Sequence, residues 1–183
     1  MNAVSAPHRW TLAEYEHMVR SGVFASGQHV ELIEGEVIDM VPQNEPHAVT
    51  LSLVDSALRG IFSAGYVIRQ QSPLLLGGAS QPEPDLAVVA GAPRDFLGRH
   101  PSAAVLVVEI SDSSLDHDRT TKLNLYARHG IPTYWIVNLV EGVLETYRDP
   151  AAGVYQERVV LRHGDTLRVG PRNVAVNVAD LLP

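Results

Sequence analysis

Two short apolar runs constrain the fold of this 183-residue chain more than any other feature. Residues 86–90 read Leu-Ala-Val-Val-Ala, and residues 105–110 read Val-Leu-Val-Val-Glu-Ile. A strand with one face in solvent alternates apolar and polar residues, whereas a strand covered on both faces is apolar throughout. The two runs therefore predict neighbouring central strands of a sheet that is covered on both faces.

Three other segments have the pattern of helices. Thr11 and Glu14 have the spacing of a capping box, which marks the first turn of a helix. Two longer segments repeat apolar residues every three or four positions, and Gly130 with Pro132 ends the second of them. The predicted helices span residues 11–21, 47–63 and 115–129.

The remaining segments predict further strands and two loops. Apolar residues on both sides of Glu34-Gly35 predict a hairpin over residues 29–40. This order of elements predicts an α/β fold with a mixed central sheet and a C-terminal β-meander. The other predicted strands are residues 66–70, 73–76, 86–90, 105–110 and 134–138, followed by the meander strands 143–147, 155–161 and 166–169, and the predicted loops are residues 42–46 and 92–102.

Length and composition limit the class of protein. A chain of 183 residues predicts one domain over 1–183, in which we expect residues 1–9 to be flexible. It has no cysteine, which excludes disulfides, a thiolate nucleophile and cysteine-bound metal. We find neither a signal peptide nor an apolar run of membrane-spanning length, so we expect a cytoplasmic protein without a membrane segment. The net charge of −7 argues against unspecific coating of nucleic acid.

Two carboxylates stand at the ends of the apolar runs. Asp85 precedes the first run, and Glu109 lies near the end of the second. A carboxylate at the end of a buried strand is costly unless it is paired or binds a cation. Taken singly, each carboxylate has an explanation without a metal, because it can cap a loop or pair with an arginine. Together they favour a shared ion, and oxygen ligands without cysteine favour Mg²⁺ or Mn²⁺.

The only lysine of the chain follows these carboxylates. Lys122 is the single lysine among 14 Lys and Arg residues, although this count alone does not separate a chemical role from a codon bias. Helical spacing places Lys122 on the same side as Tyr126, which directs its ammonium group toward the sheet. Asp118 lies four residues upstream on that side and is a candidate to orient the lysine. Ser111, two residues beyond Glu109, emerges near the same strand end.

This order of residues resembles the PD-(D/E)XK nuclease superfamily. More closely, it resembles the Uma-type family of restriction-endonuclease-like proteins, over about residues 10 to 160. The matching segments are Glu31-Leu32-Ile33-Glu34-Gly35-Glu36, Pro42 with His47, Pro84-Asp85-Leu86-Ala87-Val88-Val89, Val107-Val108-Glu109-Ile110-Ser111, Asp118-Arg119-Thr120-Thr121-Lys122 with Tyr126, and Ile131-Pro132-Thr133-Tyr134-Trp135-Ile136-Val137.

The resemblance implies a restriction-endonuclease-like core that hydrolyses DNA with a metal ion. In such a site Asp85 and Glu109 bind Mg²⁺ or Mn²⁺, and Lys122 polarises the attacking water or stabilises the pentavalent phosphate. The sequence departs from the superfamily pattern at Ser111, where a lysine is expected two residues after the glutamate. The Uma-type pattern has the same departure and carries its lysine on the following helix, as Lys122 does here.

Two further residues are candidates for the same site. Glu31 precedes the hairpin turn and is either an additional metal ligand or a solvated hairpin residue. His47 opens a predicted helix and either contacts metal, water or phosphate or only caps the helix. Glu36, past the turn, depends on the hairpin register and ranks below both. We expect Tyr134 and Trp135 to pack in the core, although an exposed Trp135 would indicate a dimer surface.

Three functions remain open at this point. The leading one is a metal-dependent DNA endonuclease, as a homodimer in which two sites cut the two strands. The second is a nuclease-fold module that binds nucleic acid or protein without cleavage, which the acidic charge and Ser111 favour. The third is a structural protein whose carboxylates pair with arginines.

Overall fold

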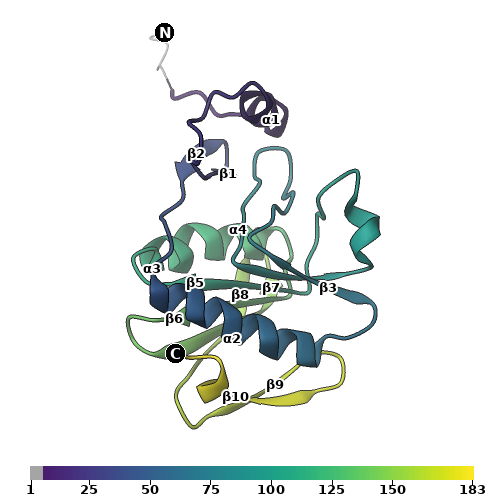
Figure 1. Cartoon of the computed structure of the whole chain (residues 1–183), viewed down its shortest axis with the longest axis vertical. Helices are drawn as coiled ribbons and strands as arrows, with labels where there is room; N and C mark the ends of the chain where they lie inside the picture. The colour runs from purple at the N-terminus through teal and green to yellow at the C-terminus, as the bar shows by residue number, and fades with distance from the viewer. Residues whose placement is uncertain (1–5) are drawn as a thin grey trace.

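A central mixed sheet forms the body of the protein in the computed structural model, which describes residues 6–183 (Figure 1). Its strands are in sequence order, and neighbours are antiparallel except for β5 and β6, which are parallel. The parallel pair requires a crossover, and the helical segment between β5 and β6 provides it. The strands are β3 (Tyr66–Gln70), β4 (Leu86–Ala90), β5 (Leu106–Ser111), β6 (Thr133–Asn138), β7 (Val143–Ala151) and β8 (Val154–Leu161).

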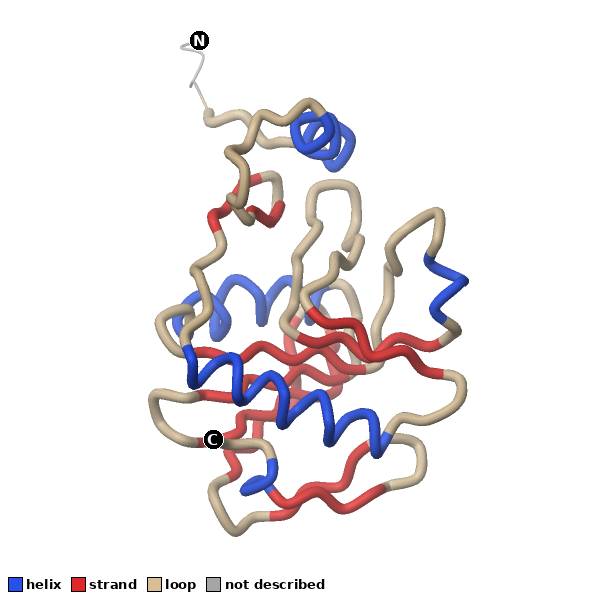
Figure 2. Tube along the Cα trace, viewed as in Figure 1, coloured by secondary structure: helices blue, strands red, loops and turns tan. Residues whose placement is uncertain are grey.

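Helices cover both faces of this sheet (Figure 2). Helix α2 (Glu45–Ile61) lies on one face, and the crossover with α4 (Leu123–Arg128) lies on the other. Side chains of β4 alternate between two hydrophobic clusters: Val88 belongs to the cluster that contains α2 residues, and Val89 to the cluster that contains α4 residues. This arrangement confirms the prediction of central strands buried on both faces.

A smaller N-terminal layer stands beyond one end of the sheet (Figure 1). It contains helix α1 (Leu12–Arg20) and the antiparallel hairpin of β1 (Val30–Ile33) and β2 (Glu36–Asp39). Thr11 and Glu14 form the predicted capping box. Leu32, which is fully buried, bridges the hairpin to Gln81 in the β3–β4 loop. The layer is thereby connected to the loop that leads into β4.

Residues 73–76 and the loop 42–46 differ from the prediction. Residues 73–76 are not a strand, because their amide groups bond to loop carbonyls: Leu74 to Pro82, Leu75 to Pro101 and Leu76 to Ser80. Helix α2 begins at Glu45, inside the predicted loop 42–46, because Asn44 caps it and a proline is tolerated in the first turn.

The predicted helix 115–129 is interrupted. It consists of α3 (Leu115–His117), a π turn named η2 (Asp118–Lys122) and α4. Such turns widen a helix by one residue and are frequent at functional sites. The spacing of apolar residues over 115–129 does not distinguish this turn from a continuous helix.

The C-terminal strands do not form one meander. Strands β7 and β8 complete the central sheet, whereas β9 (Thr166–Val169) pairs with a strand that the sequence did not predict, β10 (Val174–Asn177). A short 3₁₀ turn, η1 (Pro93–Phe96), interrupts the predicted loop 92–102, and another, η3 (Val178–Asp180), follows β10. Trp135 is fully buried, as predicted.

The prediction of a flexible N-terminus covers residues 1–9. Of these, residues 1–5 lie outside the described residues. Arg9 contacts Glu36 of the hairpin, with 2.5 Å between its Nη1 and Oε1. Within residues 6–183, no helix combines the length and the apolar character that crossing a membrane requires.

Candidate active site

The register of β4 and β5 brings Asp85 and Glu109 together. Leu86 pairs with Val108 in the antiparallel ladder, so the residue before β4 lies opposite the end of β5. The amide of Asp85 donates to Oε2 of Glu109 over 3.3 Å, and the amide of Ile110 donates to Oδ2 of Asp85 over 2.9 Å. The two carboxylates that the sequence singles out therefore share one corner of the sheet.

Lys122 reaches this corner from the end of the π turn. Its Nζ lies 3.1 Å from Oε1 of Glu109 and 3.3 Å from Oε1 of Glu31. The hydroxyl of Tyr126 also donates to Oε1 of Glu109, over 2.7 Å. All four side chains are almost completely buried. Glu31, for which the sequence left a metal-binding and a solvated role open, is thus buried beside the lysine.

Burial and charge act against each other in this ion pair. Burial opposes the charge of Lys122, but the carboxylates of Glu109, Glu31 and Asp118 outweigh it and raise the pKa of the lysine. Burial also raises the pKa of Glu109, and Lys122 acts in the opposite direction. The lysine is therefore an ammonium ion across the physiological pH range.

Asp118 fixes the π turn rather than contacting the ion pair directly. Its Oδ2 accepts hydrogen bonds from Ser111 over 2.7 Å and from Ser114 over 2.6 Å. Its backbone carbonyl accepts a further bond from Tyr134 over 3.2 Å. Ser111 therefore holds the first residue of the turn whose last residue is Lys122.

His47 contacts Asp85 from the first turn of α2. Its Nε2 lies 3.0 Å from Oδ2 of Asp85, while its Nδ1 is buried and has no hydrogen-bond partner among the described residues. Burial acts to lower the pKa of His47, but the hydrogen bond and the charge of Asp85 outweigh it and raise the pKa. Gln71 reaches the other oxygen of Asp85 over 3.4 Å. The helix start therefore positions His47 beside the carboxylate.

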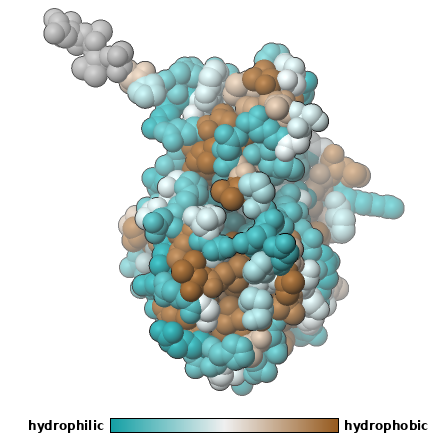
Figure 3. Space-filling view, turned by 60° about the vertical axis from the view of Figure 1, so that its left-hand side comes forward, coloured by the Kyte–Doolittle hydropathy of each residue, from teal (hydrophilic) through white to brown (hydrophobic). Residues whose placement is uncertain are grey.

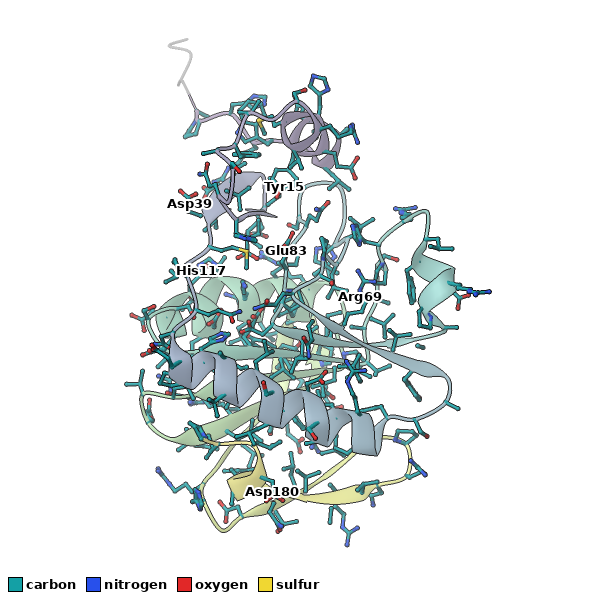
Figure 4. The ribbon with its side chains drawn as sticks, viewed as in Figure 1. Tyr15, Asp39, Arg69, Glu83, His117 and Asp180 are labelled. Carbon is teal, nitrogen blue, oxygen red and sulfur yellow. The ribbon has the colours of Figure 1, made fainter. Side chains whose placement is uncertain are left out.

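A cavity of about 330 Å³ lies between the hairpin, the β3–β4 loop and the start of the crossover, and its lining includes Glu31, His47, Gln71, Asp85, Glu109, Asp118 and Lys122. Figure 3 shows hydrophilic residues around a hollow below the N-terminal layer. Asp39, Glu83 and His117, which are labelled in Figure 4, also line the cavity. Glu36, by contrast, is exposed and pairs with Arg9.

The cavity has more acidic than basic groups. Its lining includes Glu31, Glu83, Asp85, Glu109, Asp112 and Asp118 but a single lysine. Burial and the nearby charge of Glu31 raise the pKa of Glu83, against the opposing charges of His29 and Lys122. Residues 6–183 contain no group of three His, Asp or Glu side chains already arranged as metal ligands. The oxygen-rich donor set and its excess negative charge nevertheless suit a hard divalent cation.

Sequence reasoning missed several lining residues of this cavity, and Glu83 and Gln71 are the two nearest to Asp85 in the chain or in contact with it. Glu83 stands two residues before Asp85 in Pro82-Glu83-Pro84-Asp85, where the two prolines hold the chain extended. Gln71 has no distinguishing pattern in the sequence and reaches Asp85 only because β3 pairs with β4.

A mixed sheet with helices on both faces and an acid–acid–lysine group at one strand corner defines a restriction-endonuclease-like nuclease core. Residues 12–178 match the model of the Uma2 family, described as "Putative restriction endonuclease", and the chain belongs to this family. A crystal structure described as a putative nuclease belonging to DUF820, from Anabaena variabilis, shares the fold. The two chains are 20% identical with a TM-score of 0.73, over 93% of this chain and 96% of the other. No curated protein sequence matches the chain.

Proposed function

We propose that this protein is a metal-dependent endonuclease that hydrolyses phosphodiester bonds of DNA. The observation that carries the proposal is the convergence of Asp85, Glu109 and Lys122 on one acidic cavity. Membership of a family described as restriction endonucleases supports the reaction class. Homodimer formation, with one site for each DNA strand, is part of the same proposal.

Asp85 and Glu109 are the residues that would hold the cation, with Glu31 as a third carboxylate on the same wall. When bound, a divalent cation supplies Lewis acidity for water and offsets the charge of the phosphodiester. Mg²⁺ or Mn²⁺ fits a donor set made of oxygen atoms. His47 and Gln71 hold the carboxylate of Asp85 from opposite sides, which fixes the direction of its oxygens.

Lys122 serves as a fixed positive charge. Its pKa is raised by the surrounding carboxylates, so it does not accept a proton from water at neutral pH. Of the two roles that a lysine has in such sites, stabilising the negative charge on the pentavalent phosphate fits this protonation state. Asp118 and Ser111 are positioning residues, because they hold the turn that carries the lysine.

Cleavage of plasmid DNA with Mg²⁺ or Mn²⁺ tests the proposal. We expect Asp85→Asn, Glu109→Gln and Lys122→Arg each to lower the cleavage rate by about a hundredfold or more, because each removes charge or shape needed in the transition state. The control is Glu36→Gln, which changes an exposed acid outside the cavity. A wild-type protein that cleaves no DNA with either metal, or an active Asp85→Asn variant, would contradict the proposal.

Binding of the cation is measured separately by a thermal melt. A ligand that binds only the folded state raises its stability, by about 2.7 kcal/mol at a hundred times the dissociation constant. Mg²⁺ should therefore raise the melting temperature of the wild type and leave that of Asp85→Asn almost unchanged. No shift in the wild type at saturating Mg²⁺ and Mn²⁺ would argue against a metal site.

A module that binds nucleic acid without cleaving it is the second candidate. The buried Ser111 at the usual position of the lysine favours it, as does the engagement of Lys122 by two carboxylates. This function predicts nucleic-acid binding that persists in EDTA and in Asp85→Asn, with no cleavage under any metal condition.

A further inference from the structure

Arg69, on the edge strand β3, is a half-buried arginine that has no acidic partner within residues 6–183. Six other arginines of the described chain form ion pairs with carboxylates, among them Arg59, Arg119 and Arg158. Within residues 6–183, the side-chain contacts of Arg69 are to an imidazole and an aromatic ring instead. Burial alone lowers the pKa of Arg69, so no nearby carboxylate offsets its desolvation. A partly buried, unpaired cation is unfavourable until an anion joins it.

The guanidinium group is nevertheless held in a fixed position. It lies over the ring of Phe96, 5.7 Å from the ring centre. Its Nη2 donates to Nδ1 of His100 over 3.0 Å, and its Nε is buried without a partner. Burial and the charge of Arg69 lower the pKa of His100, which suits a neutral imidazole that accepts this bond. The arginine is thus preorganised. Because Nε is closed to solvent, a bound anion would contact the terminal Nη groups.

Arg69 also lies close to the candidate active site. It stands two residues before Gln71, whose side chain reaches Asp85, and it pairs across the sheet with Ala87, two residues after Asp85. The β3–β4 loop and the loop that carries Phe96 and His100 rise from the same side of the sheet (Figure 1), and Figure 4 labels Arg69 near their base. The second loop also carries the exposed Arg94 and Arg99. These three arginines, together with the exposed Asp95, lie on the strand and loop next to the β3–β4 loop, and none of them lines the acidic cavity itself.

We propose that Arg69, stacked on Phe96 and braced by His100, binds a phosphodiester group of the nucleic-acid strand adjacent to the group presented to Asp85 and Glu109. This inference rests on the proposed function and adds to it a residue that binds the phosphate backbone of the substrate. Arginine suits this role because its planar fork matches phosphate oxygens. An acidic protein needs such local contacts, because its overall charge repels DNA.

Binding in EDTA separates this role from catalysis. The measurement is the fluorescence anisotropy of a labelled single-stranded oligonucleotide and of its duplex, titrated with wild type and with Arg69→Met over a range of KCl concentrations. We expect Arg69→Met to weaken binding about tenfold, as for the loss of one hydrogen bond to a charged group. The slope of log K against log salt should fall by about 0.7 for the single strand or about 0.9 for the duplex. The form of DNA that shows the loss is the form that the subsite binds.

Two further variants complete the design. Arg59→Met removes the same charge from the exposed side of α2, where Arg59 pairs with Asp55, and should leave both affinity and slope unchanged. Arg69→Lys keeps the charge but loses the fork, so it should retain the salt slope and bind more weakly than the wild type. If a thermal melt shows that Arg69→Met is poorly folded, Arg69→Lys still tests the phosphate subsite. The subsite predicts that this variant binds DNA more weakly while the slope of log K against log salt stays unchanged.

The outcomes separate the two proposals. Equal affinity and slope for wild type, Arg69→Met and Arg69→Lys would overturn the phosphate subsite, even if the wild type cleaves DNA. Absence of any DNA binding by the wild type would also overturn it. Arg69-dependent binding without cleavage under any metal condition would support the subsite while contradicting the nuclease proposal.

Discussion

At the scale of single residues, the ion pair of Lys122 with Glu109 and Glu31 is the contact on which the candidate site depends. Two carboxylates and one ammonium group are buried together, with Tyr126 supplying a further hydrogen bond. Desolvation of such groups is costly, and attraction between them only partly offsets that cost. Removing the lysine would leave two buried acids without a cation.

A double-mutant cycle measures this dependence. We expect Lys122→Met to lower the free energy of unfolding by about 3 kcal/mol at neutral pH, because Glu109 and Glu31 lose their counter-charge. In a Glu109→Gln background the same substitution should cost less, with a coupling of about 1 kcal/mol or more by urea unfolding. Additive effects of the two substitutions would show that the pair makes no net contribution to stability.

At the scale of elements, the π turn η2 is held from both sides. Asp118 is bound by Ser111 and Ser114, and the next residue, Arg119, reaches Glu145 on β7, with 2.9 Å between its Nε and Oε1. Glu145 is fully buried and also accepts a bond from Arg158 over 2.9 Å. Although burial acts to raise it, these and neighbouring hydrogen bonds lower the pKa of Glu145 to about 2. Strand β7 thereby anchors the turn that presents Lys122.

Because of this lowered pKa, the free energy of unfolding depends on pH. A carboxyl group with a depressed pKa in the folded state contributes stability above its unfolded value, 4.5, and loses it as the pH falls toward about 2. The shift corresponds to at most about 3 kcal/mol, since the partner arginines are partly solvated. We expect Glu145→Gln to be about 2 kcal/mol less stable at neutral pH and to lose less stability below the unfolded value. Urea unfolding at several pH values tests this, with the exposed Glu157→Gln as the control.

At the scale of the whole molecule, the N-terminal layer completes the cavity. Strand β1 carries Glu31 to Lys122, and the hydroxyl of Tyr15 on α1 donates to the carbonyl of Val30 over 2.8 Å. Glu31 is also held by the amide of Glu83, over 3.1 Å. The layer therefore acts as a wall of the site, although it lies outside the central sheet.

Loosening this layer should affect activity and stability together. We expect Tyr15→Phe to lower the free energy of unfolding by about 1 kcal/mol, because the buried carbonyl of Val30 loses its donor. DNA cleavage should also slow, since Glu31 is less firmly placed. Tyr66→Phe is the matched control, since Tyr66 lies on β3 and packs its ring against Phe62, outside the N-terminal layer. Equal stabilities of the two variants would show that the Tyr15 contact does not hold the layer.

Local sequence pattern was sufficient to predict those strands, helices and site residues that depend on neighbouring positions in the chain. The apolar runs located β4 and β5, and their ends located Asp85 and Glu109, because a buried strand leaves few explanations for a terminal carboxylate. Helical spacing directed Lys122 toward the sheet, where it lies 3.1 Å from Glu109. These inferences needed only the periods of strands and helices.

The tertiary structure alone decided what depends on contacts between distant segments. It placed Glu31, since a hairpin can dock in many orientations, and it joined Gln71 to Asp85 through strand pairing. It formed the π turn, for which the local sequence has no signal. In this turn the side chains of Asp118 and Arg119 find hydrogen-bond partners on other elements. It also left residues 73–76 without a strand partner, because β4 was already paired on both sides. Local propensity cannot encode these choices, since each is settled by which buried polar groups find partners across the fold.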